Sequence, residues 1–368
     1  MGIKTKRFLA TVCFALFLIS CARAFPRVEW ALGTVCSVNL FEDGTHGLYS
    51  DIFERIREIE RDMTAFTPPI VGVAGAASVS QVVEIGRQAG IAPVRVGADL
   101  IYVLERALHF AEISDGAFDP TIGPLTALWG IGTERQRVPS DDEIADALAL
   151  VNWRDLVIDR AAGTAFLRRR GMSLDLGSIA KGFAGDESAW IAREAGVRRA
   201  MIDLGGNIVA VGMRQRRGNA LERFFSRRVH ADLPWRIGIQ NPIRGRGAHM
   251  GIVEVSDTSV VTSGVYERFF HAPGPDGVTR RFHHLLCTRT GFPVENGLLS
   301  VTIVTRSSTD ADALSTAAFA LGYPRGRAIV EATPGAEAIF VFEDRRVRIT
   351  GGLADVFRLT GEEFTLSR

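Results

Sequence analysis

The sequence has little of what defines the specialised classes of protein. Its 368 residues include only four cysteines, and 43 basic against 42 acidic side chains leave a formal net charge of +1. So few cysteines, far apart in the chain, provide neither a disulfide framework nor a zinc site, and the balanced charge excludes a general electrostatic preference for nucleic acid. The sequence contains no repeat of fixed period and no low-complexity segment. The composition is that of a globular protein, in which any anionic substrate must be recognised by a local site.

An apolar run near the N-terminus indicates export. Three basic residues precede the apolar residues 8–19, a stretch that is too short to span a bilayer comfortably, since a spanning helix needs roughly 20 residues. This arrangement is typical of a secretory signal. The run ends in Leu-Ile-Ser-Cys, which resembles a bacterial lipobox and predicts lipidation of Cys21. The small residues up to Ala24 leave open a plain signal that is cleaved after that residue. In either case, residues 1–20 serve export and not the fold.

Two cysteines, Cys36 and Cys287, remain for the mature protein once the signal and the proposed anchor are set aside. An exported protein can pair such cysteines, and free buried thiols are an equally reasonable outcome. The sequence leaves both open.

The hydrophobic pattern predicts helices and strands that are mixed without strict alternation, which indicates an α+β fold with mixed sheets and packed helices. Helical periodicity occurs at residues 48–63, 99–114, 141–150, 179–194 and 310–321. Runs typical of strands occur at residues 32–40, 172–176, 200–204, 208–212, 235–240, 251–255, 260–262 and 301–305. Residues 67–77 are rich in Pro, Gly and Ala and predict a loop. The arginine-rich residues 213–233 predict a solvated excursion, with a partner-binding arm as the alternative.

The first candidate site surrounds a predicted helix start. Asp175 ends a predicted strand, Gly177 and Ser178 form a turn, and Lys181 lies in the first turn of the helix that follows. Ser178 is a candidate N-cap, and the free N–H groups of such a helix start, together with the helix dipole, favour a phosphate. The glycine spacing matches neither the Walker motif nor the dinucleotide fingerprint. From these residues alone, a capped helix with an exposed lysine explains the pattern as well as a phosphate site does.

A second candidate lies in the predicted helix at residues 310–321. Asp312 and Thr316 are four residues apart, so on a helix they face the same way. Carboxylate and hydroxyl oxygens are hard ligands that suit Mg²⁺. Taken alone, a carboxylate near a helix start is more simply explained by its favourable interaction with the helix dipole.

Two further segments carry side chains with possible chemistry. His283 and His284 precede a predicted turn, and a histidine at a strand end can act as a general base near neutral pH. In residues 116–120, Phe118 stands where an aromatic side chain could line a flat ring, and Asp119 could accept a hydrogen bond. An Asp-Pro pair also simply makes a turn, so this segment has two interpretations.

Together and in this order, these segments resemble the FAD:protein FMN transferase family, also called ApbE-like lipoproteins. The resemblance is carried by eight stretches spread over essentially the whole mature chain. They are LGTVCSV from Leu32, GAFDPTIGPLTALWG from Gly116, LDLGSIAKGFAGD from Leu174, IDLGGNIVAVG from Ile202, WRIGIQNP from Trp235, VVTSGVYERFF from Val260, HHLLCTRTGFPV from His283 and SSTDADALSTAAFALG from Ser307. The resemblance implies one ApbE-like domain over residues 21–368.

The resemblance also implies an activity and a location. Family members bind FAD and Mg²⁺ outside the cytoplasm and transfer the FMN half of FAD to a Thr or Ser hydroxyl of an acceptor flavoprotein, releasing AMP. Some members instead hydrolyse FAD to FMN and AMP. The implied partners are FAD as substrate, an acceptor that by analogy is a membrane respiratory flavoprotein, and a membrane reached through lipid on Cys21. The implied location is the periplasmic face of a bacterial membrane, with no nucleic-acid partner.

The functional positions of the family fall on residues of the candidate sites. The metal site falls on Ser178, through its backbone carbonyl, and on Asp312 and Thr316. The histidine of the family falls on His284, so that His284 and Asp312 are the implied catalytic residues. The implied flavin- and phosphate-side residues are Leu32, Phe66, Ala117, Phe118, Asp119, Asp175, Lys181 and His284.

Three departures from the family pattern bear on activity. Cys287 and Thr288 stand where the family has Asp-Pro after its histidine, which removes a carboxylate and a rigid turn. Leu32 falls where the family usually places Met. The Ser-Glu-x-Ser-x-x-Asn segment of the family is hard to find, because residues 67–77 form an altered or inserted loop and residues 78–85 a degenerate remnant. An FAD pyrophosphatase and a non-catalytic flavin-binding lipoprotein therefore stay open as alternatives.

Overall fold

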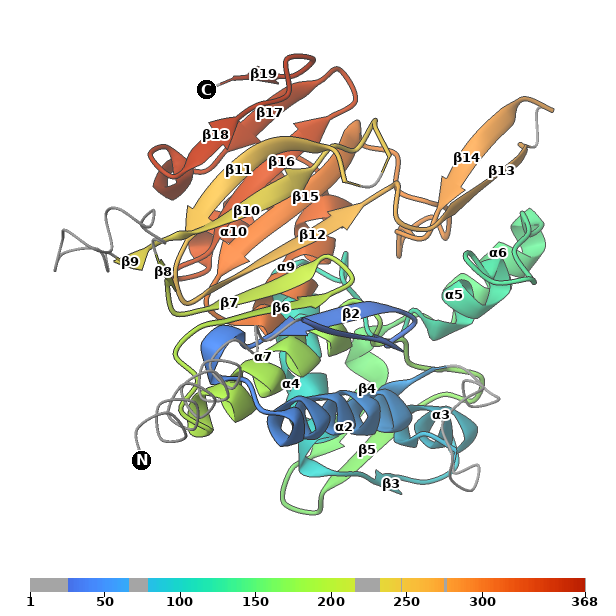
Figure 1. Ribbon diagram of the computed structural model, residues 1–368. Helices are drawn as coiled ribbons and strands as arrows, with labels where there is room; N and C mark the ends of the chain where they lie inside the picture. The colour runs from blue at the N-terminus through green and yellow to red at the C-terminus, as the bar shows by residue number, and fades with distance from the viewer. Residues whose placement is uncertain (1–25, 66–78, 216–231, 246, 275–276, 368) are drawn as a thin grey trace, which may run out of the picture.

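The computed structural model describes residues 26–65, 79–215, 232–245, 247–274 and 277–367 of the chain (Figure 1). Several sequence predictions lie outside these residues: the export signal, the lipidation site Cys21, Phe66, the loop at residues 67–77 and most of the arginine-rich segment 213–233. Within the described part, no helix combines the length and the apolar character that crossing a membrane requires.

The fold is organised around one large sheet, which has nine strands within the described residues. Their order is β1-β2-β6-β7-β12-β15-β16-β17-β19, and neighbouring strands are antiparallel except for β17 and β19. The strands are β1 (Arg27–Ala31), β2 (Thr34–Asn39), β6 (Ala200–Leu204), β7 (Asn207–Val211), β12 (Thr258–Gly264), β15 (Leu298–Thr305), β16 (Glu337–Phe342), β17 (Arg346–Ile349) and β19 (Thr365–Leu366). Every residue of β15 is buried, which shows that both faces of the sheet are covered at its centre.

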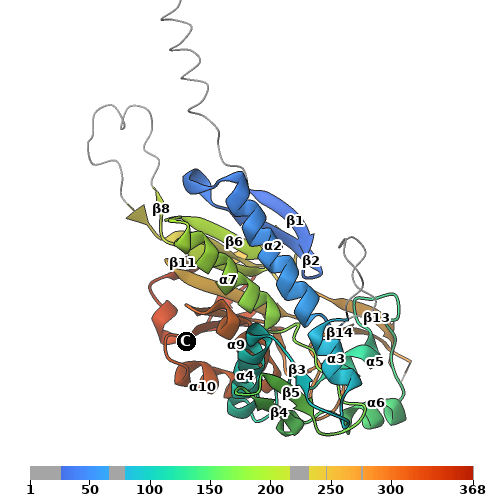
Figure 2. The same ribbon diagram turned by 90° about the horizontal axis from the view of Figure 1, so that it is seen from below.

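Helices cover one face of this sheet. The helices α7 (Ala180–Glu194) and α9 (Ser308–Leu321) pack against each other and against the central strands. Outside them, α2 (His46–Met63) lies along α7, as Figure 2 shows, while α4 (Ala98–Ile113) and α10 (Arg325–Ala332) contact α9. In Figure 1 the small sheet of β10 (Trp235–Gln240), β11 (His249–Val255) and β18 (Phe357–Leu359) lies in front of β15 and β16. The layers therefore bring the N-terminal ends of α7 and α9 together at the centre of the molecule.

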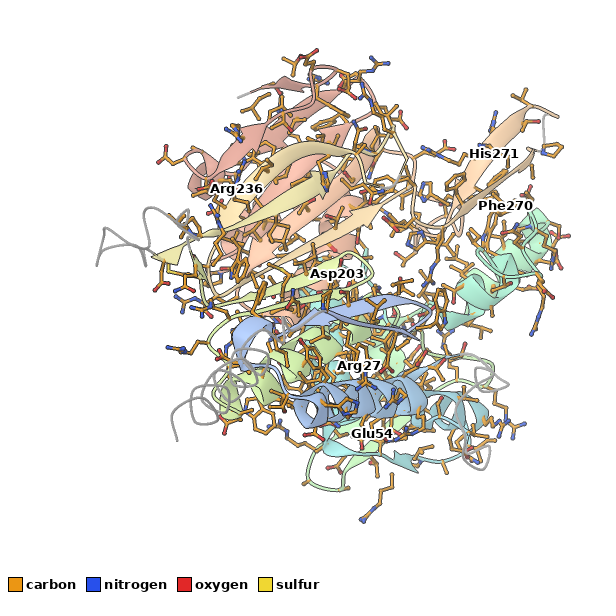
Figure 3. All side chains as sticks on the ribbon, in the orientation of Figure 1. Arg27, Glu54, Asp203, Arg236, Phe270 and His271 are labelled. Atoms are coloured by element: carbon orange, nitrogen blue, oxygen red, sulfur yellow. The ribbon has the colours of Figure 1, made fainter. Side chains whose placement is uncertain are left out.

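Two smaller assemblies flank this core. The strands β3 (Val94–Arg95), β5 (Thr164–Leu167) and β4 (Leu156–Asp159) form a sheet next to α3 (Gln81–Arg87). The hairpin of β13 (Phe269–Pro273) and β14 (Thr279–His283) shares a separate buried cluster with α5 (Gly123–Trp129) and α6 (Asp141–Leu148). Phe270 packs on this cluster, whereas the next residue, His271, is exposed (Figure 3). The remaining short elements are η1 (Phe41–Asp43), η2 (Trp153–Asp155), η3 (Gly351–Leu353), β8 (Arg214–Gln215) and β9 (Asp232–Leu233).

The structure confirms the α+β fold class and the five predicted helices, which correspond to α2, α4, α6, α7 and α9. In α2 the predicted apolar face is buried throughout, at Ile52, Ile56, Ile59 and Met63. The helices α3, α5 and α10 were not predicted, because seven or eight residues display little helical period; α6 is equally short, but the acidic residues of its first turn mark its start.

Two predicted strands are wrong, one of them in part. Leu32 and Gly33 belong to the turn between β1 and β2, with φ angles of +53° and +67°, and the strand begins only at Thr34. The strand predicted at residues 172–176 is an irregular segment in which Ser173 forms an isolated bridge with Ile122. The chain turns there to start α7, and the Asp175 carboxylate accepts a hydrogen bond from the Gly177 N–H at 2.8 Å. This local bond replaces the pairing that a strand would need.

Candidate active site

A cavity of about 810 Å³ opens where the starts of α7 and α9 meet the β1–β2 turn and the base of the β13–β14 hairpin. This size is typical of a pocket for a small molecule or cofactor. Residues predicted from four separate stretches of sequence line it together: Ala117, Phe118, Asp119, Asp175, Ser178, Lys181, His284, Asp312 and Thr316. The fold therefore places nearly all of the predicted site residues within the described part of the chain around one space.

The start of α7 presents a cationic side chain to this cavity. The Lys181 Nζ donates to the Gly177 carbonyl at 3.0 Å, which uses one of the three N–H groups of the ammonium. The predicted N-cap role of Ser178 is wrong. The N-cap position belongs to Ile179, and no side chain caps the helix there. In this first turn the Ala180 N–H donates to the Leu176 carbonyl at 2.9 Å and the Gly182 N–H to Asp312, so the Lys181 ammonium and the helix dipole are what the helix start offers to an anion in the cavity.

The start of α9 presents a buried carboxylate. Asp312 is only 4% exposed, and its Oδ2 accepts a hydrogen bond from the Gly182 N–H of α7 at 2.9 Å. Burial raises the pKa of Asp312, while the charge of Lys181, the Gly182 N–H and the neighbouring Asn207 side chain oppose that rise. One turn further along α9, the Thr316 Oγ1 lies 3.0 Å from the Ser263 Oγ of β12. Two oxygen-bearing side chains of α9 thus face the cavity, as their spacing predicts.

These oxygens fit a hard divalent cation. The donor set is one carboxylate, one hydroxyl and the predicted Ser178 carbonyl, and Mg²⁺ is usually bound by one or two carboxylates together with substrate phosphates. Over the described ranges, no group of three or more His, Cys, Asp or Glu side chains is arranged to hold a metal. Asp312 and Thr316 therefore offer part of a coordination shell for such a cation.

The two adjacent histidines differ in environment. The His283 Nε2 lies 3.1 Å from the Val294 carbonyl, and its Nδ1 accepts from the Leu285 N–H at 3.3 Å, so both ring nitrogens serve the fold. His284 lines the cavity, and its Nδ1 lies 3.3 Å from the Arg268 carbonyl. A carbonyl only accepts, so the proton belongs on Nδ1 and Nε2 keeps a lone pair. Desolvation and the nearby Arg268 charge lower the pKa of His284 to about 3, so this imidazole is neutral and its Nε2 presents a lone pair as an acceptor.

Arg268 is a cavity residue to which the sequence analysis assigned no role. It ends the chain segment between β12 and β13, and its carbonyl accepts from the His284 N–H at 3.1 Å, which closes the base of the hairpin. Its guanidinium reaches the β1–β2 turn, where a Cβ added to Gly33 would lie 3.7 Å from Nη2. The matching stretch VVTSGVYERFF contains Arg268. Asn207, Thr262, Ser263 and Glu267 also line the cavity without having been predicted.

The turn at residues 116–121 combines the two interpretations that the sequence left open. Ala117, Phe118 and Asp119 line the cavity. The Asp119 carboxylate also accepts hydrogen bonds from the Thr121 N–H and hydroxyl, both at 2.7 Å, and from the Trp153 N–H at 2.9 Å. Phe118 is 3% exposed and packs edge-on against Phe110. These bonds mean that Asp119 shapes the turn, and the turn in turn forms one wall of the cavity.

Leu32 is a predicted flavin-side residue that does not line the cavity. It is partly buried against the main hydrophobic core, whereas its neighbours Gly33 and Thr34 face the cavity. The second predicted residue of this kind, Phe66, lies outside the described residues.

The two cysteines of the mature chain are both free. Cys36 is completely buried in β2, and burial raises the pKa of its thiol to about 12. Cys287 is half-buried beside the cavity base. Of the two outcomes left open by the sequence, free thiols describe the structure.

Comparison with known proteins points in one direction. The sequence profile of the ApbE family matches residues 32–340. A curated relative from Treponema pallidum, named FAD:protein FMN transferase, is 37% identical over an alignment covering 97% of this chain and 96% of that protein. A relative of the same name from Klebsiella pneumoniae is 35% identical and covers 73% of this chain and 77% of its own length.

Solved structures share the fold. An ApbE protein from Thermotoga maritima matches with a TM-score of 0.71 and 31% identity, covering 88% of this chain and 96% of that one. The flavin transferase ApbE from Vibrio cholerae matches with a TM-score of 0.70 and 25% identity, covering 92% of this chain and 97% of that one. The similarity therefore extends through the elements that form the cavity.

Proposed function

The chain belongs to the ApbE family, and from this membership and the geometry of its cavity we propose that it is an FAD:protein FMN transferase. The observation that carries the proposal is the convergence, in one cavity of about 810 Å³, of a helix start with Lys181, the oxygens of Asp312 and Thr316, and the neutral imidazole of His284. A diphosphate between two nucleoside-like halves is a ligand that uses all of these groups at once.

The cavity offers FAD two kinds of contact, positive charge for its diphosphate and an apolar turn for its flavin half. Lys181 and the positive end of the α7 dipole receive the diphosphate oxygens, since both favour an anion. Arg268 adds a second positive charge to the cavity lining. The turn around Ala117 and Phe118 lies beside this point and suits the flavin half of the molecule.

The reaction is a displacement at the phosphorus of the FMN half. The hydroxyl oxygen of an acceptor Thr or Ser forms a bond to this phosphorus, and the bond from phosphorus to the oxygen of the AMP phosphate breaks, so that AMP leaves with the electron pair. The Nε2 of His284 accepts the hydroxyl proton, a contribution of about 10²–10⁴-fold for a well-placed base. The rest of the catalysis consists of positioning and charge stabilisation, as in other phosphoryl transfers.

We propose that Mg²⁺ binds Asp312, Thr316 and the backbone carbonyl of Ser178. A divalent cation there supplies neutralisation of the diphosphate and of the charge that develops on departing AMP. Asp312 contributes a carboxylate that is already fixed by the Gly182 N–H at 2.9 Å. Thr316 is oriented by the Ser263 hydroxyl at 3.0 Å.

The proposal is tested by incubating the purified protein with FAD, Mg²⁺ and a candidate acceptor that presents Thr or Ser. Mass spectrometry should detect a covalent FMN adduct on the acceptor, with one AMP released per adduct. Release of FMN and AMP without any adduct would instead establish an FAD pyrophosphatase, in which water replaces the hydroxyl. Stable FAD binding without turnover would leave a flavin-binding protein.

We further propose that the protein is exported and anchored through lipid on Cys21, so that it meets a membrane respiratory flavoprotein as acceptor at the periplasmic face. The lipobox-like sequence before Cys21 and the basic, apolar start of the chain support this. The wild-type protein should sediment with membranes, and Cys21→Ser should release it. If wild type and Cys21→Ser are both soluble and both begin at the residue after Ala24, the segment is a plain cleaved signal.

A further inference from the structure

The helices that carry the proposed magnesium and diphosphate ligands are bonded to each other by reciprocal carboxylates. Asp312 of α9 accepts the Gly182 N–H near the start of α7 at 2.9 Å. In return, Asp186 of α7 accepts the Ser308 N–H at 2.8 Å and the Thr309 N–H at 2.9 Å, at the start of α9. The hydroxyls of Thr309, at 2.7 Å, and of Ser307, at 3.2 Å, complete a set of four donors around Asp186. Each helix thus receives a carboxylate of the other at its positive end.

This arrangement requires the two helices to be unusually close. A Cβ at Gly182 would lie 2.3 Å from the Ser308 carbonyl oxygen, and a Cβ at Gly185 would lie 2.9 Å from the Ser308 Oγ. Gly185 directly precedes Asp186 in α7, and Gly182 lies one turn before it. The close contact places the Gly182 N–H within reach of Asp312, and the Asp186 carboxylate within reach of the first N–H groups of α9.

Asp186 does not line the cavity, so it touches neither substrate nor metal. Its four donors fix the start of α9, and Asp312 and Thr316 follow within the next two turns of the same helix. We propose that Asp186 is a positioning residue that sets the place of Asp312 and Thr316, and thereby the affinity of the site for Mg²⁺. This inference rests on the proposed magnesium site of the transferase and names a residue beyond its ligands.

The expected behaviour differs from that of a general structural residue. Groups that hydrogen-bond metal ligands typically change metal affinity by about 10–100-fold when removed, and Asp186, which acts through the backbone at the start of α9, should fall at the lower end of that range. Asp186→Ala removes all four acceptor contacts and should raise the Mg²⁺ concentration for half-maximal activity by an amount in this range. Saturating Mg²⁺ should restore kcat to within about twofold, because the ligands themselves are intact. Asp186→Asn keeps one carbonyl acceptor and should give an intermediate shift.

A matched control is available at the start of α9, the helix end to which Asp186 is bonded. Asp310 also lies in the first turn of α9, but it bonds Arg106 of α4 at 2.8 and 3.0 Å instead of α7. Asp310→Asn removes a carboxylate from the same helix end without touching the contact between α7 and α9. Its half-saturating Mg²⁺ concentration should stay at the wild-type value even if its thermal stability falls.

The experiment measures two quantities for wild type, Asp186→Asn, Asp186→Ala and Asp310→Asn. They are the Mg²⁺ dependence of turnover and the Mg²⁺-induced rise in melting temperature of the FAD-bound protein. The inference is supported if the Mg²⁺-induced rise in melting temperature is smaller in the two Asp186 variants and unchanged in Asp310→Asn. Folded Asp186 variants with wild-type Mg²⁺ dependence in both readouts would overturn it, as would a wild-type protein that Mg²⁺ does not stabilise. A protein that Mg²⁺ stabilises but that labels no acceptor would refute the transfer reaction alone.

Discussion

A substitution at Gly182 tests whether the distance between α7 and α9 controls the metal site. In Gly182→Ala the new Cβ would lie 2.3 Å from the Ser308 oxygen and 2.7 Å from the Thr309 Cα, both backbone atoms that cannot rotate away. Ordinary contact begins at 3.4 Å, so the helices must separate locally by about 1 Å. The hydrogen bond from the Gly182 N–H to Asp312, now 2.9 Å, would lengthen to about 4 Å and be lost.

The energetic cost follows from two opposing effects. Overpacking of this kind typically costs about 1–3 kcal/mol, and the higher helix propensity of alanine offsets about 1 kcal/mol of that. The folded protein should therefore survive with a modestly lower melting temperature. The affinity for Mg²⁺ should fall by about 10–100-fold, because Asp312 loses the donor that fixes it.

Gly326→Ala provides the steric control for this measurement. A Cβ at Gly326 would also lie 2.3 Å from a backbone oxygen, that of Ala318, but at the contact between α9 and α10 away from the cavity. Thermal unfolding and the Mg²⁺ dependence of AMP release should be measured on both variants. We expect comparable losses of stability and a raised Mg²⁺ requirement in Gly182→Ala alone. Similar Mg²⁺ requirements in the two variants would refute the link between helix spacing and the metal site.

Three further predictions concern the cavity. Burial raises the pKa of Asp312, so activity should be lost on acidification at a higher pH than an ordinary carboxylate would cause. Because Mg²⁺ and protons compete for this carboxylate, tenfold more Mg²⁺ should shift the pH of half-maximal activity down by up to about one unit. A pH of half-maximal activity that does not depend on Mg²⁺ would contradict the assignment. His284→Ala should lower kcat by about 10²–10⁴-fold with FAD affinity retained, whereas His283→Ala should mainly lower the melting temperature; equal kinetic effects would argue against His284 as the base. Lys181→Met should raise the dissociation constant for FAD by about tenfold at low salt, and an unchanged titration would remove Lys181 from the diphosphate site.

The sequence predicts the long amphipathic elements best. The apolar face of α2 can be predicted from the spacing of Ile52, Ile56 and Ile59, and all three are buried as expected. Short elements such as α5 have seven residues and pack on a separate cluster built from distant segments, so local periodicity does not reveal them. The strand predicted up to Leu176 is absent for a similar reason. Its apolar residues are buried by tertiary contacts in an irregular segment, and β-type composition alone does not require a neighbouring strand.

The site residues divide in the same way. Asp312 and Thr316 could be paired from their spacing on a helix, but nothing in the sequence shows that Gly182 of another helix would donate to Asp312 at 2.9 Å. Asp186 is the last residue of the matching stretch LDLGSIAKGFAGD, but a carboxylate in the middle of a helix does not show which groups it bonds. Its partners lie more than 120 residues away, at Ser308 and Thr309. Contacts between residues so far apart in the chain depend on the whole fold, and the sequence indicated that fold only through its resemblance to the family.

The replacement of the family's Asp-Pro pair by Cys287 and Thr288 does not dismantle the turn that follows the base. The Cys287 N–H donates to the Phe292 carbonyl and the Gly291 N–H to the Cys287 carbonyl, both at 2.7 Å, so the backbone closes the turn. The Thr288 hydroxyl donates to the Gly116 carbonyl at 2.7 Å, which ties this turn to the cavity wall.

The surroundings of the Cys287 side chain change the pKa of its thiol. Burial alone would raise the pKa of Cys287, but hydrogen bonds from the Thr290 hydroxyl and from nearby backbone N–H groups lower it overall. His284 is fixed separately, by the Arg268 carbonyl at 3.1 Å from its N–H. This backbone hydrogen bond holds His284 without the Asp-Pro pair that the family has at the following positions.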